Sequence, residues 1–142
     1  MTGPGALLID TGTTLFEARA IAEDVPDIAN LEVSHIVLTH NHFDHILGSS
    51  ALDGAEIYCA AEVATTMAER TEHLRADAVR YGADAAEVDR AIAALRAPEH
   101  RVTSAVVDLG DRSVGQPSGP WTHKPRLDRR RHRLRQARGV LR

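Results

Sequence analysis

The sequence predicts an α/β fold for residues 5–111, in which strands are covered by helices on one side. Short apolar runs rich in β-branched residues, such as residues 36–38, are typical of buried strands. Apolar residues spaced three and four apart, as in residues 88–95, are typical of helices packed on a sheet. The two patterns alternate along the chain. A length of 142 residues suits one domain with its own core.

The first elements are a strand and a helix that lead to a polar loop. Residues 6–9 are predicted to form a buried strand that enters Asp10. A helix follows, capped by one of the threonines at positions 13 and 14, and we expect Pro26 to end it. Residues 34–39 are then predicted as a second buried strand that leads directly into the loop.

The later elements continue the alternation. They are a short helix (46–52), a strand (55–59), two longer helices (60–75 and 84–95) and a strand (102–109). Val63, Met67 and Leu74 form the expected core face of the first longer helix. An apolar stripe of this kind is more often core than binding surface, so we assign no site to these helices.

The polar loop after the second strand carries a cluster of metal-binding residue types. It holds His40, His42, Asp44 and His45. Histidine is the commonest side-chain metal ligand, and a carboxylate adds a harder oxygen ligand. His40 and His42 are two apart, so on extended backbone they point the same way and can bind one metal, while Asp44 and His45 can face a second. The alternative is a loop of exposed polar residues.

The run Thr39-His40-Asn41-His42-Phe43-Asp44-His45 resembles the signature of the metallo-β-lactamase superfamily. That signature is a strand followed by Thr-His-x-His-x-Asp-His and a glycine-containing helix start, and Ile46-Leu47-Gly48 stands in the last place. Residues 7–12 resemble the family's apolar strand that ends in Asp-Thr-Gly. The resemblance covers about residues 5–112 and implies about half of an αββα sandwich, because the chain is short for the whole architecture.

The resemblance implies a zinc-dependent hydrolase of small-molecule substrates, with one or two ions and with iron or manganese as other candidates. His40 and His42 would bind one metal, and Asp44 and His45 the other. Further ligands would come from downstream. A metal-activated water held by Asp44 would attack an ester, thioester, lactam or phosphoester, and Asp44 would help to protonate the leaving group. Asp10 would orient the loop by hydrogen bonding, although Asp-Thr-Gly is also typical of a turn.

The downstream ligands are not recognisable in this sequence. No Gly-His pair follows residues 110–111, where the family places its next ligand loop. His123 lies at a suitable distance, but the neighbouring Lys124 opposes a cation. We expect His35 to be packed or at a sheet edge, and His73 and His100 to face solvent.

Composition indicates a cytoplasmic protein. No apolar run approaches the length of a membrane span, and the N-terminus lacks the features of a secretory signal. Cys59 is the single cysteine, which excludes a disulfide framework. It falls in a predicted strand, so we expect a buried and unreactive thiol.

Charge divides the chain near residue 112. Residues 1–111 hold 7 arginines, no lysine and 19 acidic residues, whereas residues 112–142 hold 9 arginines and Lys124 against Asp128 alone. We expect residues 1–112 to form the domain and residues 113–142 a basic unstructured tail, because so few apolar residues cannot offset the entropy of ordering.

The basic tail supports an alternative function, a non-catalytic protein that binds nucleic acid or another anionic surface. Nucleic acid is an unlikely partner, because the tail lacks interleaved aromatic residues that would stack on bases. A third possibility is a module that holds one metal through residues 40–45 alone.

A reading-frame shift in the gene is our hypothesis for the abrupt change after residue 112. Read one nucleotide later, the codons for residues 119–127 permit Gly-Arg-Gly-His-Thr-Asn-His-Asp-Leu, which resembles the missing ligand loop. In the same shifted frame, the codons for the arginines at positions 129–131 permit three valines. The chain would then be a truncated, impaired hydrolase. The nucleotide sequence is the test: a stop codon in the shifted frame over residues 113–142, or no histidine codon at the junction of residues 122 and 123, contradicts the hypothesis.

Overall fold

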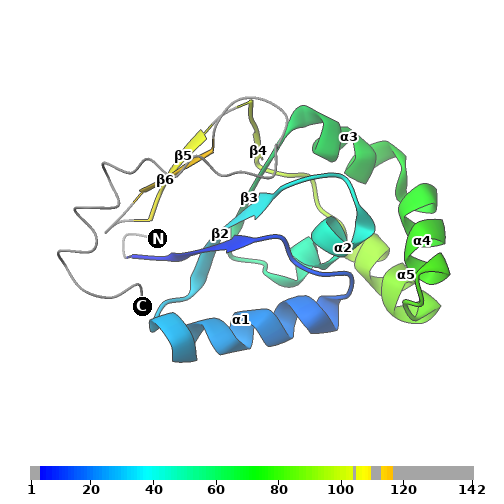
Figure 1. Ribbon diagram of the computed structural model, residues 1–142, viewed down its shortest axis with the longest axis horizontal. Helices are drawn as coiled ribbons and strands as arrows, with labels where there is room; N and C mark the ends of the chain where they lie inside the picture. The colour runs from blue at the N-terminus through cyan, green and yellow to red at the C-terminus, as the bar shows by residue number, and fades with distance from the viewer. Residues whose placement is uncertain (1–3, 104, 110–112, 117–142) are drawn as a thin grey trace.

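The computed structural model of the protein describes residues 4–103, 105–109 and 113–116, and these residues form an α/β fold (Figure 1). One sheet is parallel, with the strand order β1 (Ala6–Ile9), β2 (Val33–Leu38), β3 (Glu56–Cys59) and β4 (His100–Arg101). A second sheet pairs β5 (Ala105–Asp108) with β6 (Ser113–Gln116) in antiparallel fashion. The predicted class, an α/β fold corresponding to part of an αββα sandwich, is confirmed.

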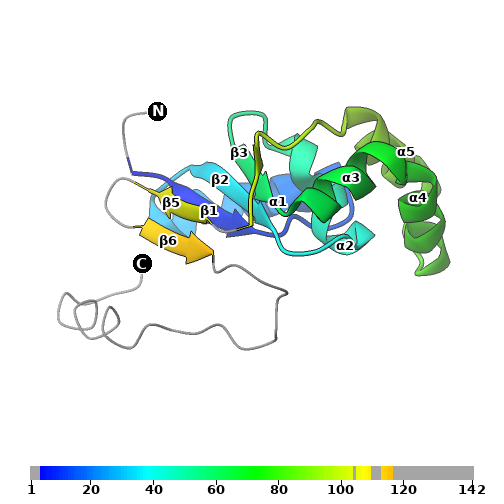
Figure 2. The same cartoon turned by 90° about the horizontal axis from the view of Figure 1, so that it is seen from above.

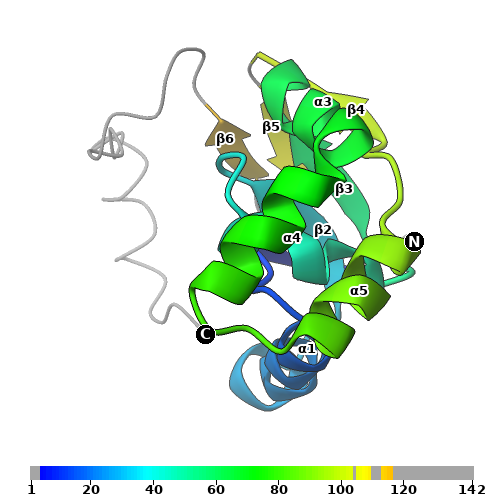
Figure 3. The ribbon, with the colours of Figure 1, turned by 90° about the vertical axis from the view of Figure 1, so that its right-hand side faces the viewer.

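Helices connect the strands of the parallel sheet. They are α1 (Leu15–Ala29), α2 (Phe43–Ile46), the 3-10 helix η1 (Leu47–Ala51), α3 (Ala61–Glu69), α4 (Thr71–Arg80) and α5 (Ala85–Ala94). Figure 2 shows α3, α4 and α5 at one end of the molecule and the β5–β6 pair at the other, and Figure 3 shows α4 beside α5. None of the helices in the described ranges has the length and apolar character needed to cross a membrane.

Helix α1 begins as predicted but ends later. The Thr14 side chain accepts a hydrogen bond from the backbone N–H of Glu17 at 3.1 Å, and the Glu17 carboxylate accepts one from the Thr14 N–H at 3.0 Å. These two bonds form a capping box. The predicted break at Pro26 is wrong, because a proline removes only one helical hydrogen bond and Asn30 N–H closes the last turn on the Pro26 carbonyl at 2.7 Å.

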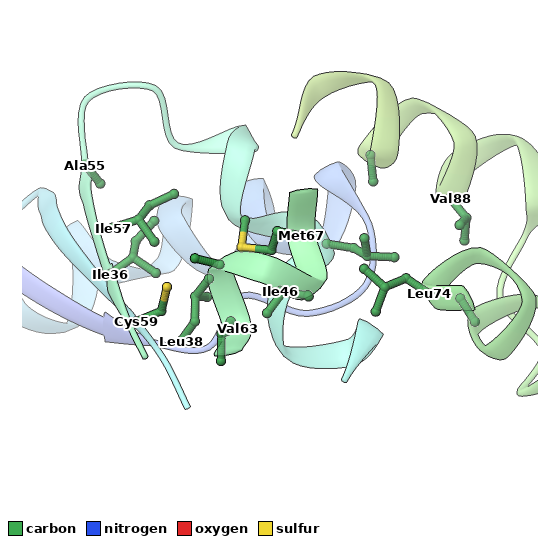
Figure 4. Packing of buried hydrophobic residues seen from close by; sticks show 14 residues of the cluster. Ile36, Leu38, Ile46, Ala55, Ile57, Cys59, Val63, Met67, Leu74 and Val88 are labelled. Atoms are coloured by element: carbon green, nitrogen blue, oxygen red, sulfur yellow. The ribbon is translucent and has the colours of Figure 1, made fainter. Parts of the chain in front are cut away.

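The apolar core lies between one face of the parallel sheet and the helices (Figure 4). Side chains alternate along β2 and β3, so Ile36, Leu38, Ile57 and Cys59 share one buried face. The expected core face of residues 60–75 is also buried, although this segment is two helices, α3 and α4, that meet at Arg70. Each fully buried leucine or isoleucine contributes about 1.5–3 kcal/mol to stability. This core holds the carboxyl ends of β1 and β2 in place.

Strands on both sides of the predicted domain boundary at residue 112 pair with each other. Residues Ser113–Gln116 pair with Ala105–Asp108, and the Gly5 N–H donates to the Leu109 carbonyl at 3.0 Å. Residues Ser113–Gln116 therefore form a strand and not part of an unstructured tail. The domain boundary near residue 112 stays a prediction. Antiparallel pairing relies on backbone groups, which composition and charge do not reveal. The rest of the predicted basic tail, residues 117–142, lies outside the described residues.

Cys59 should react with thiol reagents far more slowly in the folded protein than in the unfolded chain. Its side chain is fully buried, and burial raises the pKa of the thiol to about 11. At pH 8 the thiolate fraction is then about two orders of magnitude lower than for an ordinary cysteine. Labelling with a chromogenic disulfide, with and without guanidinium chloride, measures this directly. Rapid labelling of the folded chain would contradict the burial of this strand.

Candidate metal centre

The polar loop lies at the carboxyl end of β2, as predicted, but its second half is helical. Residues 39–42 form the connection, His42 is the N-cap of α2, and Asp44 and His45 lie on this single helical turn. The expectation of a loop throughout residues 40–45 is therefore correct for His40 and His42 and wrong for Asp44 and His45. The turn places the Asp44 and His45 side chains beside those of the preceding extended residues.

A close approach to the β1–α1 connection holds α2 and η1 in place. The backbone N–H and the hydroxyl of Thr11 both donate to the His45 carbonyl at 3.0 Å, and Gly48 N–H donates to the Gly12 carbonyl at 3.1 Å. A Cβ on Gly48 would lie 2.4 Å from the Thr11 carbonyl oxygen and 2.9 Å from the Ala18 Cβ. A glycine is needed here because no side chain fits between η1 and this turn.

Asp10 links the end of β1 to both halves of the loop. One carboxylate oxygen accepts the Thr39 N–H at 2.8 Å, and the other accepts the Thr39 hydroxyl and lies 2.7 Å from His45 Nδ1. The backbone of Asp10 adopts φ 61°, a conformation that costs an aspartate free energy. The expectation that Asp10 orients the loop by hydrogen bonding is confirmed.

These hydrogen bonds also determine which imidazole nitrogens remain available. A carboxylate only accepts, so His45 Nδ1 carries the proton that it donates to Asp10. The Thr39 hydroxyl donates to Asp10, so at 2.9 Å it accepts from His40 Nδ1. In both rings the lone pair is therefore on Nε2, the atom that a metal would bind.

The four predicted site residues lie together. The imidazole centroids are 3.8 Å apart for His40 and His45, 4.6 Å for His40 and His42, and 6.5 Å for His42 and His45. His45 Nε2 is 3.4 Å from an Asp44 carboxylate oxygen. Burial, followed by repulsion from His45 and His42, lowers the pKa of His40 below its usual value. A lowered pKa favours the neutral imidazole, which is the form that binds metals.

The donor types of the loop fit zinc, but their positions do not form a closed coordination group. Among the described residues, no set of three or more His, Cys, Asp or Glu side chains is arranged to hold one metal ion. His35, His73 and His100 lie elsewhere: His35 contacts Ser34, His73 pairs with Asp77, and His100 stacks on Tyr58. His123, the downstream candidate, lies outside the described ranges.

A cleft beside the loop was not predicted from the sequence. It has a volume of about 450 Å³ and lies between residues 41–44 and one face of α4 with its flanking residues. Polar residues on that face are Arg70, His73, Asp77 and Arg80. Their spacing of three and four is the signal that could have identified this face, but the apolar residues of the same segment indicated only a core helix.

A sequence model of the metallo-β-lactamase superfamily matches residues 2–125, a longer stretch than the resemblance noted in the sequence. No curated protein matches the chain.

The chain is similar to solved structures of three metallo-β-lactamases and spans about two fifths of their length. The FIM-1 enzyme from Pseudomonas aeruginosa in its mono-zinc form is 21% identical, with a TM-score of 0.48 and coverage of 74% of this chain and 39% of that one. The protein from Hirschia baltica is 16% identical, with a TM-score of 0.44 and coverage of 75% and 41%. The protein from Pontibacter korlensis is 19% identical, with a TM-score of 0.47 and coverage of 80% and 43%. Because the family model matches most of the sequence, the chain belongs to the metallo-β-lactamase superfamily.

Proposed function

We propose that this chain carries the first part of the metal site of a zinc-dependent hydrolase that acts on a small molecule. The observation that supports the proposal is the cluster of His40, His42 and His45 imidazoles, two of which present Nε2 because Asp10 and Thr39 bind Nδ1. The Asp10 carboxylate binds Nδ1 of His45, on the opposite side of the ring from Nε2. This arrangement orients Nε2 for a metal, which a cluster with only a packing role would not require. Such carboxylate–histidine pairs are typical of metal ligands.

The residues of the loop have distinct roles in the proposed reaction. His40 and His42 would hold one ion, and His45 with Asp44 a second position beside it. A bound zinc ion would lower the pKa of a coordinated water toward neutrality. Asp44 would accept a hydrogen bond from the attacking water and return a proton to the leaving group. Its carboxylate is half exposed and lines the cleft, so a substrate can reach it.

The bond that is cleaved belongs to an ester, thioester, lactam or phosphoester, the groups that an activated water attacks. Iron or manganese would suit the same ligand types as zinc. The four loop residues are fewer ligands than two ions need, so we expect weaker metal affinity than in a site with a full ligand set.

Metal stoichiometry and turnover together test the proposal. Two equivalents of zinc, with hydrolysis of at least one member of an ester, thioester, lactam and phosphodiester panel that stops on chelation, would support the hydrolase. One equivalent without turnover would indicate a single-metal module. No bound metal, with binding to polyanions, would favour the binding protein. Asp44→Asn should reduce turnover by about 10²-fold or more, and Asp53→Asn in an exposed turn is the matched control.

A further inference from the structure

One side of helix α1 combines exposed apolar side chains with acidic ones. Phe16 and Ile28 are each 74% exposed, and Ile21 is 37% exposed. Glu23 and Asp24 are exposed between them. Spacings of three, four and seven residues place these five side chains on the same side of the helix, which we call the outer face of α1. The opposite side packs against η1, and Figure 1 shows α1 along the lower edge of the molecule.

The acidic residues of α1 are unfavourably placed when the helix is considered alone. Asp27 lies in the last turn, where the negative end of the helix dipole opposes a carboxylate, and this turn has no basic residue. Glu23 and Asp27 are four residues apart, so they repel each other. Within the described ranges, neither they nor Asp24 form an ion pair with another side chain. A cationic partner at this surface would relieve both effects.

The helices at the other end of the molecule balance their charges internally. Three arginines of α4 and α5 pair with acidic residues of the same two helices, namely Arg75 with Asp89, Arg80 with Asp77, and Arg90 with Glu87. The outer face of α1 lacks such pairs and adds exposed apolar side chains. It is therefore suited to a partner that is both cationic and partly apolar.

Residues 117–142, which follow β6 in the sequence, have the complementary composition. They hold eight arginines and Lys124 against Asp128 alone, and Leu127 and Leu134 stand among the arginines. A chain of this length can span up to about 90 Å when extended, whereas a domain of about 110 residues has a radius of gyration of about 13 Å. The segment is therefore long enough to reach α1 from the end of β6 at Gln116.

We propose that the outer face of α1 binds residues 117–142 of the same chain. Arginines of the segment pair with Glu23 and Asp24, and its leucines contact Phe16 and Ile28. Each exposed ion pair is weak, so binding depends on several pairs and on the covalent link, which keeps the segment at a high effective concentration. The segment need not fold in order to bind in this way. A reading-frame shift that replaced residues 117–142 would remove the ligand and leave the surface.

A spin label on the segment tests its position in the full chain. Gln136→Cys supplies a reactive thiol for a nitroxide, because Cys59 is fully buried and its pKa is raised to about 11. The amide NMR signals of residues 20–28 should lose intensity, while those of α3, which lies away from α1 in Figure 3, should not. At 1 M salt the Debye length falls to about 3 Å, so the loss should largely disappear. Equal loss at α1 and α3, or no loss, would overturn the proposal.

Substitutions on α1 identify the surface that binds the segment. The double variant Glu23→Gln/Asp24→Asn should remove most of the intensity loss at residues 20–28. It also removes repulsion within α1, so the helix itself should not be destabilised. The matched control is Glu69→Gln/Glu72→Gln, which neutralises two exposed carboxylates elsewhere and should leave the loss unchanged. An undiminished loss in the folded Glu23→Gln/Asp24→Asn protein would contradict the assignment.

A mixed sample distinguishes binding within one chain from binding between copies. Isotope-labelled chain without the nitroxide is combined with unlabelled chain that carries it at Gln136→Cys. Residues 20–28 of the isotope-labelled chain should then keep their intensity, because the segment of each chain occupies its own α1. Intensity loss as large as in the singly labelled chain would overturn binding within one chain and would assign the segment to a second copy.

Discussion

Replacing His42 by alanine is expected to abolish zinc binding by this chain. His42 is a proposed direct ligand at the N-cap of α2, and the loop has few ligands to compensate for its loss. Substitution of a residue that only hydrogen-bonds a metal ligand typically reduces metal affinity about 10–100-fold. Loss of a direct ligand such as His42 should reduce zinc affinity by more than that. The His42 side chain makes no capping hydrogen bond, so its removal should hardly change the stability of α2. Calorimetric zinc titration and metal analysis after dialysis measure the effect.

The control for this variant is His100→Ala. His100 lies on β4, where it contacts Glu56 and Tyr58, and it is not part of the loop. Like His42→Ala, the His100→Ala substitution removes one imidazole from the protein. It therefore controls for non-specific zinc binding by histidine side chains. Unchanged zinc binding in His42→Ala, with the same stoichiometry as in His100→Ala, would show that the loop is not the metal site.

Replacing Asp10 by alanine should reduce both stability and zinc affinity. The carboxylate is 20% exposed and accepts hydrogen bonds from Thr39 N–H, the Thr39 hydroxyl and His45 Nδ1. Removing it leaves these donors without partners, which should lower the free energy of unfolding by about 2 kcal/mol after allowance for partial exposure. The His45 ring also loses its orientation, so zinc affinity should fall by about 10–100-fold. Urea denaturation and zinc titration measure the two effects separately.

Asp10→Asn separates the structural role of Asp10 from its role in positioning His45. Asparagine tolerates the positive φ and can still accept the Thr39 N–H, but its amide nitrogen cannot accept the proton of His45 Nδ1. The zinc affinity of Asp10→Asn should therefore be as low as that of Asp10→Ala. Its free energy of unfolding should be closer to that of the wild-type protein. The exposed Asp27→Ala is the charge-matched control. Wild-type stability and wild-type zinc affinity in Asp10→Ala would rule out the role assigned to this carboxylate.

Much of the fold was predictable because the relevant signals are local. Ile36 and Leu38 alternate with less buried residues and identify a strand, and Thr14 with Glu17 forms a capping box within four residues. Pro26 was misinterpreted because its effect depends on its position relative to the end of the helix, which Asn30 determines through its left-handed φ of 52°. The pairing of β6 with β5 was missed because backbone hydrogen bonds carry no residue-specific signal.

The sequence alone determined the residue types of the proposed site and their order, because few residue types bind metals and their spacing in residues 40–45 is distinctive. It also indicated that Asp10 would support the loop. Only the tertiary structure decided which atoms of Asp10 bind which donors, and hence that Nε2 of His40 and His45 remains available. It also placed the polar face of α4 opposite His42 and Asp44, a juxtaposition across some 30 residues of chain. Direct contacts between α2 and α4 accompany that arrangement, and such long-range contacts leave no local pattern in the sequence.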